Sequence, residues 1–107
     1  MALNQTLMIR RFDPRHAPEV AKIFERTDQE TSLPQRIGVR RRDLFEYQGS
    51  CLHLVQCDQD FIARLRETRN DPDWRELDQA LRAYLFPSDP AKPGIELLTP
   101  FYTWIND

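Results

Sequence analysis

Hydrophobic and polar positions change their spacing several times along the chain, and each change predicts a new element. Residues 6–12 are short, rich in apolar side chains and followed by the turn signal Asp13-Pro14, which predicts a strand. Over residues 17–28 apolar side chains recur every three to four positions behind Pro18, which predicts an amphipathic helix. Pro34 then breaks a polar segment, so we expect the helix to have ended and the chain to turn there.

A β-hairpin is predicted in the middle of the chain. Residues 37–47 favour a strand, although three arginines interrupt it, and residues 51–57 favour the returning strand. The Gln48-Gly49-Ser50 segment between them is a tight-turn signal. The two strands should therefore pair directly with each other.

The length of the turn decides which arginine lies beside His53. If the turn consists of Gln48 and Gly49 alone, Arg42 is the diagonal neighbour of His53 on the same face of the sheet, ~7 to 8 Å away between Cα atoms. A three-residue turn reverses the faces and puts Arg41 beside His53 instead. Both registers are open at the level of the sequence.

The second half of the chain predicts two more helices and a last strand. Residues 58–84 return to a helical period with a break at residues 70–72, residues 86–94 form a proline-rich extended loop, and residues 95–105 form a strand. Three apolar positions of the second helix are expected in the core: Trp74, Leu77 and Leu81.

The order β-α-β-β-α-β predicts an α+β, ferredoxin-like fold, with a four-stranded antiparallel sheet and both helices on one face. A chain of 107 residues fits one domain, residues 1–107. Such a sheet leaves its other face bare, and small proteins of this shape often cover it by dimerising. We therefore expect a homodimer.

Charge and composition narrow the possible partners. Fifteen basic and seventeen acidic residues give a net charge of −2, which argues against nucleic acid as the main partner. The sequence has neither an apolar stretch of ~18 residues nor the apolar core of a signal peptide, so we expect a cytoplasmic protein that does not enter membranes. Cys51 and Cys57 would lie roughly 20 Å apart on one extended strand, which predicts two free thiols.

Few residues are left that can carry chemistry. With two histidines, two cysteines and no clustered carboxylates, a metal site is not expected, and neither a phosphate-binding glycine loop nor a nucleophile motif is present. His53 and its neighbouring arginine remain. An arginine can stabilise a developing enolate, and an imidazole with a pKa near ~6.5 can move protons. The structural alternative is a buried histidine with satisfied hydrogen bonds and arginines on a solvated face.

Four ordered motifs resemble the tetracenomycin-type cyclases of bacterial aromatic polyketide synthesis. The family has an Asp-x-Thr-x-Leu-Pro element, an Ile-Gly-Val-x-Arg-Arg strand, a strand containing His-Leu and a Phe-Tyr-x-Trp ending. Here these motifs correspond to residues 28–34, 37–42, 51–54 and 101–104. The resemblance covers nearly the whole chain.

The resemblance implies a dimeric α+β barrel and a ring closure without a cofactor. An aromatic polyketide intermediate, free or carrier-bound, is deprotonated between two carbonyls, and the enolate attacks another carbonyl before water is lost. The family's catalytic histidine, arginine and aspartate carry over to His53, Arg42 and Asp28. One extra residue before Leu-Pro leaves Gln29 as the alternative for the aspartate position. Four further residues are expected to contact the substrate: Thr27, Phe45, Tyr102 and Trp104.

Two other functions are compatible with this fold. One is a monooxygenase of the same dimeric type that oxidises a polyketide ring without metal or flavin. The other is a non-catalytic module that holds a polyketide intermediate for a synthase or an oxygenase. Oxygen consumption separates the first from a cyclase, and binding without a change of product identifies the second.

Overall fold

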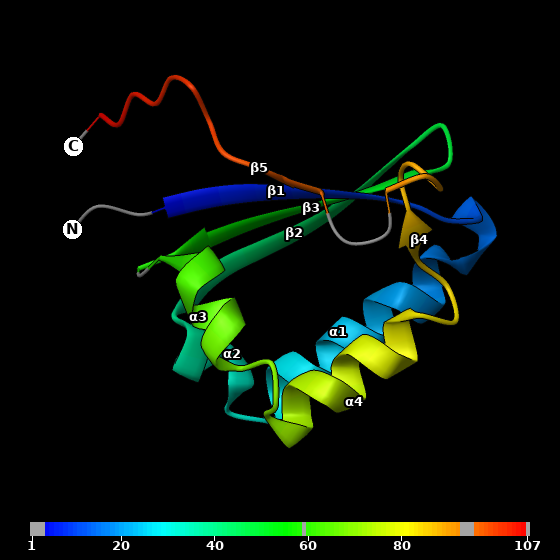
Figure 1. The fold of residues 1–107 in the computed structure, drawn as a ribbon, viewed down its shortest axis with the longest axis horizontal. Coiled ribbons are helices and arrows are strands. Elements are labelled where there is room, and N and C mark those ends of the chain that lie inside the picture. The colour runs from blue at the N-terminus through cyan, green and yellow to red at the C-terminus, as the bar shows by residue number, and fades with distance from the viewer. Residues whose placement is uncertain (1–3, 59, 93–95, 107) are drawn as a thin grey trace.

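An antiparallel sheet forms one layer of the molecule, and helices cover one of its faces (Figure 1). The structure is a computed structural model and describes residues 4–58, 60–92 and 96–106. Strands follow the order β2-β3-β1-β4, and β5 also pairs with β1. The strands are β1 (Asn4–Arg11), β2 (Val39–Tyr47), β3 (Ser50–Cys57), β4 (Phe86–Pro87) and β5 (Glu96–Leu98). The helices are the 3₁₀ turn η1 (Pro14–His16), α1 (Ala17–Glu30), α2 (Leu33–Ile37), α3 (Phe61–Glu67) and α4 (Pro72–Leu81).

This arrangement confirms the predicted α+β fold with β3 and β1 at the centre of the sheet. The helices lie below the sheet in Figure 1, and the C-terminal segment runs above it. Within the described ranges, no helix is long and apolar enough to cross a membrane.

The β2–β3 hairpin has the two-residue turn. Gln48 and Gly49 both have positive φ, 49° and 81°, and Tyr47 pairs with Ser50. Two consecutive left-handed residues give a turn whose twist matches that of the strands, and glycine adopts this conformation without steric cost. The register pairs Arg42 with Val55. Arg42 therefore shares the helix-covered face with the buried His53, as the shorter turn predicts.

Strand alternation decides which side chains enter the core. Every second residue of β3 is buried, from Cys51 to Cys57, and the same period on β1 buries Thr6, Met8 and Arg10. Three of these inward positions carry polar groups, Thr6, Arg10 and His53, whereas the others are apolar. Polar side chains at such positions are costly unless they bind something.

Three predicted segments differ from the structure. Residues 33–37 form the short helix α2 because Pro34 lies in its first turn, where a missing N–H costs nothing. Gly38, with φ of 88°, ends this helix and directs the chain into β2. The last strand is much shorter than predicted, since β5 ends at Leu98 before Pro100, which has no N–H to give to a sheet. The predicted loop also contributes β4, which pairs with Arg10 and Arg11.

Candidate functional site

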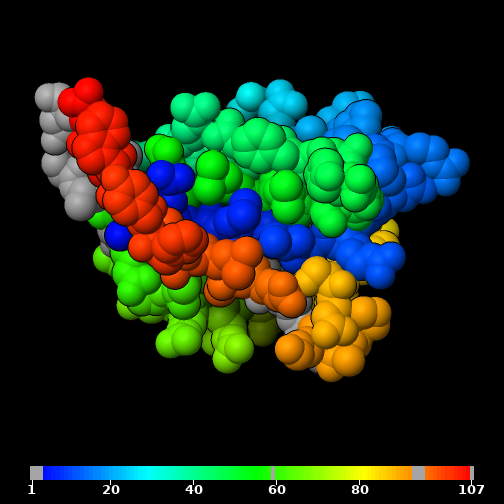
Figure 2. All heavy atoms as spheres, turned by 90° about the horizontal axis from the view of Figure 1, so that it is seen from above, coloured from blue at the N-terminus to red at the C-terminus, as the bar shows by residue number. Residues whose placement is uncertain are grey.

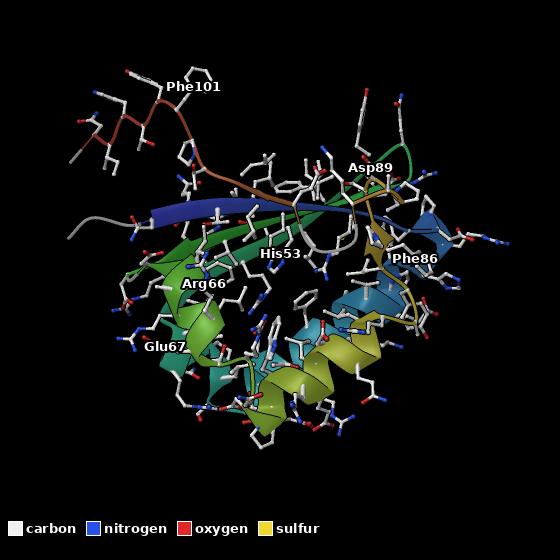
Figure 3. All side chains as sticks on the ribbon, in the orientation of Figure 1. His53, Arg66, Glu67, Phe86, Asp89 and Phe101 are labelled. Carbon is white, nitrogen blue, oxygen red and sulfur yellow. The ribbon has the colours of Figure 1, made fainter. Side chains whose placement is uncertain are left out.

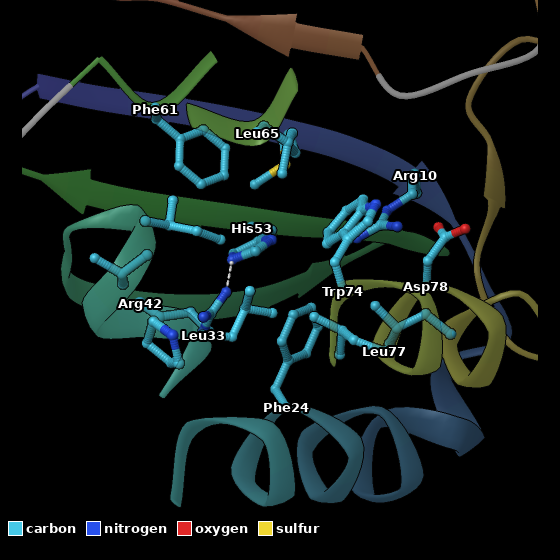
Figure 4. A pocket seen from close by; sticks show the side chains of 15 residues that line it. Arg10, Phe24, Leu33, Arg42, His53, Phe61, Leu65, Trp74, Leu77 and Asp78 are labelled. Carbon is cyan, nitrogen blue, oxygen red and sulfur yellow. Dashed lines mark hydrogen bonds between the residues drawn. The ribbon is translucent and has the colours of Figure 1, made fainter. Parts of the chain in front are cut away.

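A small cavity lies between the inner face of the sheet and the helices. Its volume is about 30 Å³, room for roughly one or two water molecules. Its apolar wall includes side chains from α1, α2, α3 and α4: Phe24, Leu33, Phe61, Leu65, Trp74 and Leu77. The polar groups that reach it are His53, Arg42, Arg10 and Asp78 (Figure 4). Ionic groups at the wall of so apolar a space interact more strongly than they would in water.

Arg42 is held on two sides. Its Nε and Nη2 donate to Oδ2 and Oδ1 of Asp28 at 3.0 and 2.9 Å, a two-point fork between β2 and α1. Its Nη1 approaches Nε2 of His53 at 2.9 Å. The Arg42 side chain is 13% exposed and that of Asp28 34%, so the pair lies at the edge of the buried layer. The carboxylate both compensates the charge of the guanidinium and fixes its orientation.

The hydrogen bond from Arg42 fixes the tautomer of His53. A guanidinium can only donate, so Nε2 is the accepting, unprotonated nitrogen and Nδ1 carries the hydrogen. Nδ1 is buried and has no partner among the described residues. It lies on the side of the ring away from Arg42 (Figure 4). One N–H donor at the cavity wall is therefore free to bind an oxygen of a ligand.

His53 is neutral at physiological pH. Burial, which leaves the residue 3% exposed, lowers the pKa of its imidazole well below the usual 6.5, and the positive charges of Arg42 and Arg10 lower it further. A neutral imidazole can accept a proton as well as donate a hydrogen bond. In this state His53 is suited to act as a base.

Phe24 completes this end of the cavity. The centroid of its ring lies 4.9 Å from that of His53, and the guanidinium carbon of Arg42 lies 4.8 Å above it. Phe24 is one helical turn before Asp28 on α1, so both side chains point to the same side of the helix. The apolar period of residues 17–28 predicts that Phe24 faces the core, and its four-residue spacing from Asp28 is the signal that it also lies beside Arg42.

The structure brings His53, Arg42 and Asp28 together but leaves the other predicted residues elsewhere. Gln29 bonds to Glu25 on the exposed side of α1, so Asp28 is the acid that meets Arg42. Thr27 is buried but lines a separate groove of about 260 Å³ between α1 and α4.

The expected position of three aromatic rings beside His53 is not found. Phe45 pairs with Leu52, so strand alternation puts it on the opposite face of the sheet from His53. Tyr102 and Trp104 follow the end of β5 and line a groove of about 440 Å³ with Leu7 and Leu54, also on that outer face. The regular alternation assumed for residues 95–105 does not extend to them.

Besides Phe24, the cavity is lined by Arg10 and Trp74, which were not predicted as part of the site. Arg10 lies in the predicted strand 6–12, where alternation puts it on the same face as Met8. Trp74 was assigned to the core, and it does pack against the core while also facing the cavity. Leu77 and Leu81 are buried in the core as predicted.

Comparison with protein families identifies a match over residues 4–105 to the family described as polyketide synthesis cyclase. Tetracenomycin F2 cyclase of Streptomyces glaucescens is 40% identical over 83 residues, which cover 78% of this chain and 75% of that protein. An uncharacterised protein of Streptomyces coelicolor is 34% identical over 106 residues, 95% of each chain.

Solved structures give a consistent result. The structure of tetracenomycin F2 cyclase, described as a type-II polyketide cyclase, matches 96% of this chain and 98% of its own with a TM-score of 0.86 and 34% identity. SnoaB of Streptomyces nogalater, a cofactor-independent oxygenase, matches with a TM-score of 0.62 over 96% and 97% of the two chains. Its identity of 18% shows a shared fold alone.

Proposed function

The chain belongs to the polyketide synthesis cyclase family and is a polyketide cyclase, and from this premise we propose that it closes a ring of an aromatic polyketide intermediate by aldol condensation and dehydration. We assign the reaction to the cavity beneath the sheet. We place the protein in the cytoplasm, where free thiols such as those of Cys51 and Cys57 persist. The observation that supports it best is the hydrogen-bonded series from Asp28 through Arg42 to His53 at the wall of this cavity.

Each member of the series has a separate task in the proposed reaction. Arg42 stabilises the enolate oxygen, because its charge and donors lie where that charge develops. His53 transfers the proton, since its imidazole is neutral and close to Arg42. Asp28 holds Arg42 in place and does not itself need to touch the substrate.

The proposed steps conserve atoms and protons. A substrate carbonyl oxygen takes over the Nη1 donor of Arg42, which frees the lone pair on Nε2 of His53. Nε2 accepts a proton from the carbon between two carbonyls, and the resulting enolate forms a carbon–carbon bond to a second carbonyl of the same chain. The imidazolium returns the proton to the alkoxide formed in this step, which becomes a hydroxyl group. His53 then takes a second proton from the carbon next to the one that bears the hydroxyl and gives it to the hydroxyl oxygen, so that water leaves and a carbon–carbon double bond forms. Holding the chain folded contributes further, since proximity accounts for ~7 to 11 kcal/mol in favourable cases.

The cavity must widen to admit such a substrate. Ligand sites measure about 300 to 1,000 Å³, whereas this cavity measures about 30 Å³. We propose that α3 is the wall that moves. It buries only Phe61 fully, with Leu65 partly buried, whereas α4 buries both Leu77 and Leu81. Displacing α3 therefore exposes less apolar surface.

We further propose that a second copy of the chain covers the outer face of the sheet. Large apolar side chains are exposed there and on the adjoining C-terminal segment, among them Phe45, Tyr47, Leu98, Phe101, Tyr102, Trp104 and Ile105. Figure 2 looks onto this face and shows the C-terminal segment, in orange and red, lying along β1. Exposed apolar patches of this kind mark interaction sites. In this arrangement the aromatic rings serve the interface, and sedimentation analysis should give twice the mass of one chain.

The reaction is tested by anaerobic reconstitution. The purified protein is added to a minimal polyketide synthase with early-ring enzymes, and the products are compared by mass spectrometry with those of a mixture that lacks it. We expect a new product lighter by one water, or one regiochemistry in place of a mixture of shunt products. Supplying the intermediate both free and on its carrier protein establishes which form is used.

Two outcomes would reject this function. Products that change only after oxygen is admitted would indicate the monooxygenase. A polyphenol that binds tightly while the products stay the same would indicate a non-catalytic module that delivers the intermediate to a synthase or an oxygenase.

A further inference from the structure

Arg10 is a second cation at the cavity, on the other side of His53 from Arg42. It pairs with Cys51 on β3, two positions from His53, and points toward the helices like Met8. Its side chain lines the cavity, and Figure 4 shows Arg42 and Arg10 on opposite sides of His53. Only 9% of the residue is exposed. Two positive charges therefore face one small apolar space.

The guanidinium of Arg10 has no hydrogen-bond acceptor and no ion-pair partner among the residues that the structure describes. Asp78 is the acidic residue that lines the cavity with Arg10. Its Oδ2, however, accepts a hydrogen bond from Nε of Arg82 at 3.0 Å, and its carboxylate makes no ion pair with Arg10. Burial lowers the pKa of Arg10, while electrostatic interactions with Cys51 and Asp78 oppose that change. Arginine remains a cation under these conditions.

A buried guanidinium with unused donors is unfavourable for the empty protein. Removing a cation from water is costly, and the cost is recovered only when an anion or several acceptors meet its donors. The planar fork of arginine fits a carboxylate at two points, as the pair of Arg42 and Asp28 illustrates at the edge of the same layer. The unused donors of Arg10 can therefore bind a carboxylate that belongs to a ligand.

We propose that Arg10 is a specificity-determining residue that binds a carboxylate on the polyketide substrate. This inference rests on the proposed ring closure in the same cavity. The carbonyl that reacts lies against Arg42 and His53, and the acidic end of the molecule lies against Arg10 across the imidazole. Trp74 and Phe24 supply the apolar surfaces between these polar ends. The substrates preferred by this chain are therefore aromatic polyketides that retain their terminal carboxylate.

The test compares two small aromatic probes in a binding experiment that needs no turnover. The probes are 3-hydroxy-2-naphthoic acid and 2-naphthol, which differ by the carboxylate, and calorimetry at pH 7 gives their affinities. The wild-type chain should bind the acid at least about tenfold more tightly, as expected for one charge-assisted hydrogen bond. The Arg10→Met variant should lose this preference while its affinity for naphthol changes less than about threefold.

Two further variants make the result specific. Arg11→Met removes the next arginine of β1, which is exposed on the other face, and should leave both affinities unchanged. Arg10→Lys keeps the charge without the planar fork and should retain part of the acid preference. If Arg10→Met does not fold, as judged by circular dichroism, the comparison of Arg10→Lys with Arg11→Met decides the question.

Equal acid affinity in the wild type and the Arg10 variants would overturn the inference, because the acid would then bind elsewhere. This result is independent of the proposed reaction, because the preference for the acid over naphthol is measured by binding alone, whether or not the chain closes a ring. In the reconstituted reaction, Arg10→Met should raise KM for the carboxylate-bearing intermediate with kcat nearly unchanged. A fall in kcat with unchanged KM would contradict a role in substrate binding.

Discussion

Arg42 and Arg10 face the same cavity from either side of His53, yet their surroundings are opposite. Three groups hold the guanidinium of Arg42: the carboxylate of Asp28, the imidazole of His53 and the ring of Phe24. Arg10 is buried, whereas Arg42 is only partly buried, and Arg10 has none of these partners in the described part of the chain. Figure 3 shows His53 between the sheet and the helices.

The difference shows how the surroundings of a cation divide its tasks. A guanidinium that is compensated and oriented by the protein is ready to stabilise a charge that appears only during a reaction, because it needs no reorganisation. A guanidinium without partners instead favours a group that arrives already charged. Substitutions on the two sides should therefore affect different quantities, namely kcat at Arg42 and affinity at Arg10.

The largest effect is expected from Arg42→Met. Loss of the charge that stabilises the enolate should lower kcat about 10² to 10³-fold, the usual result of removing such a donor. The rate of cyclised product is measured by mass spectrometry in the reconstituted reaction. Arg41→Met is the matched control, since Arg41 is exposed and bonds to Asp43. Equal rates for the two variants would remove Arg42 from the mechanism.

His53→Gln should come next, with kcat lower by roughly 10²-fold because proton transfer loses its base. The variant keeps a polar side chain near Arg42, so a folded protein is expected and can be checked by circular dichroism. Because proximity supplies much of the acceleration, some activity should remain. A variant as fast as the wild type would show that the substrate forms its enol without a base from the protein, so that His53 is not needed for proton transfer.

Asp28→Asn tests whether the orientation of Arg42 matters as well as its presence. Weakening the fork should lower kcat about tenfold, in line with the loss of a hydrogen bond between charged groups. Asp28→Glu should restore part of the rate, which a purely structural effect on folding would not predict. Gln29→Ala, at the next position and exposed, serves as the control and should be neutral.

Stability should depend on pH through His53. Its pKa is lowered in the folded chain, by burial first and by Arg42 and Arg10 next, so below pH ~6.5 the unfolded chain binds a proton that the folded chain does not. The free energy of unfolding should therefore fall as the pH drops below ~6.5, by up to about 1.4 kcal/mol per unit, until the folded pKa is reached. Urea titrations at pH 7, 6 and 5 measure the slope. An equal slope in His53→Gln would assign it to other groups.

The smallest effect expected is a gain in stability. Arg10→Met replaces a buried, unpartnered cation by an apolar side chain of similar length and should raise the free energy of unfolding by about 1 kcal/mol. Arg42→Met should lower it, because Asp28 loses its partner. Thermal denaturation of the two variants measures both changes. A loss of stability in Arg10→Met would mean that the guanidinium has a partner within the protein.

The parts of the structure that follow local rules were predictable. The hairpin itself was predicted, whereas its register stayed open between two turn lengths. The structure has the shorter turn, which puts Arg42 beside His53. The helix α2 was missed because a proline that ends one helix can equally begin another. The short β5 was missed because aromatic residues after Pro100 resemble a strand although they have no strand to pair with.

Arg10 was missed for a different reason. Alternation along β1 puts it on the same face as Met8, but the sequence does not reveal whether an inward arginine finds an acceptor. That depends on Asp78, whose carboxylate is engaged by Arg82 one helical turn further along the chain. Local patterns predict where a charged side chain points, whereas its partners depend on tertiary packing.

The small volume of the cavity has a consequence for selectivity. If the open form is a minor population, every ligand that enters is weakened by the same factor, the fraction of molecules that are open. This factor cancels when the affinities of two ligands are compared. Discrimination between polyketides then depends on their polar groups more than on their size, and the opening equilibrium sets only how much of any of them is bound.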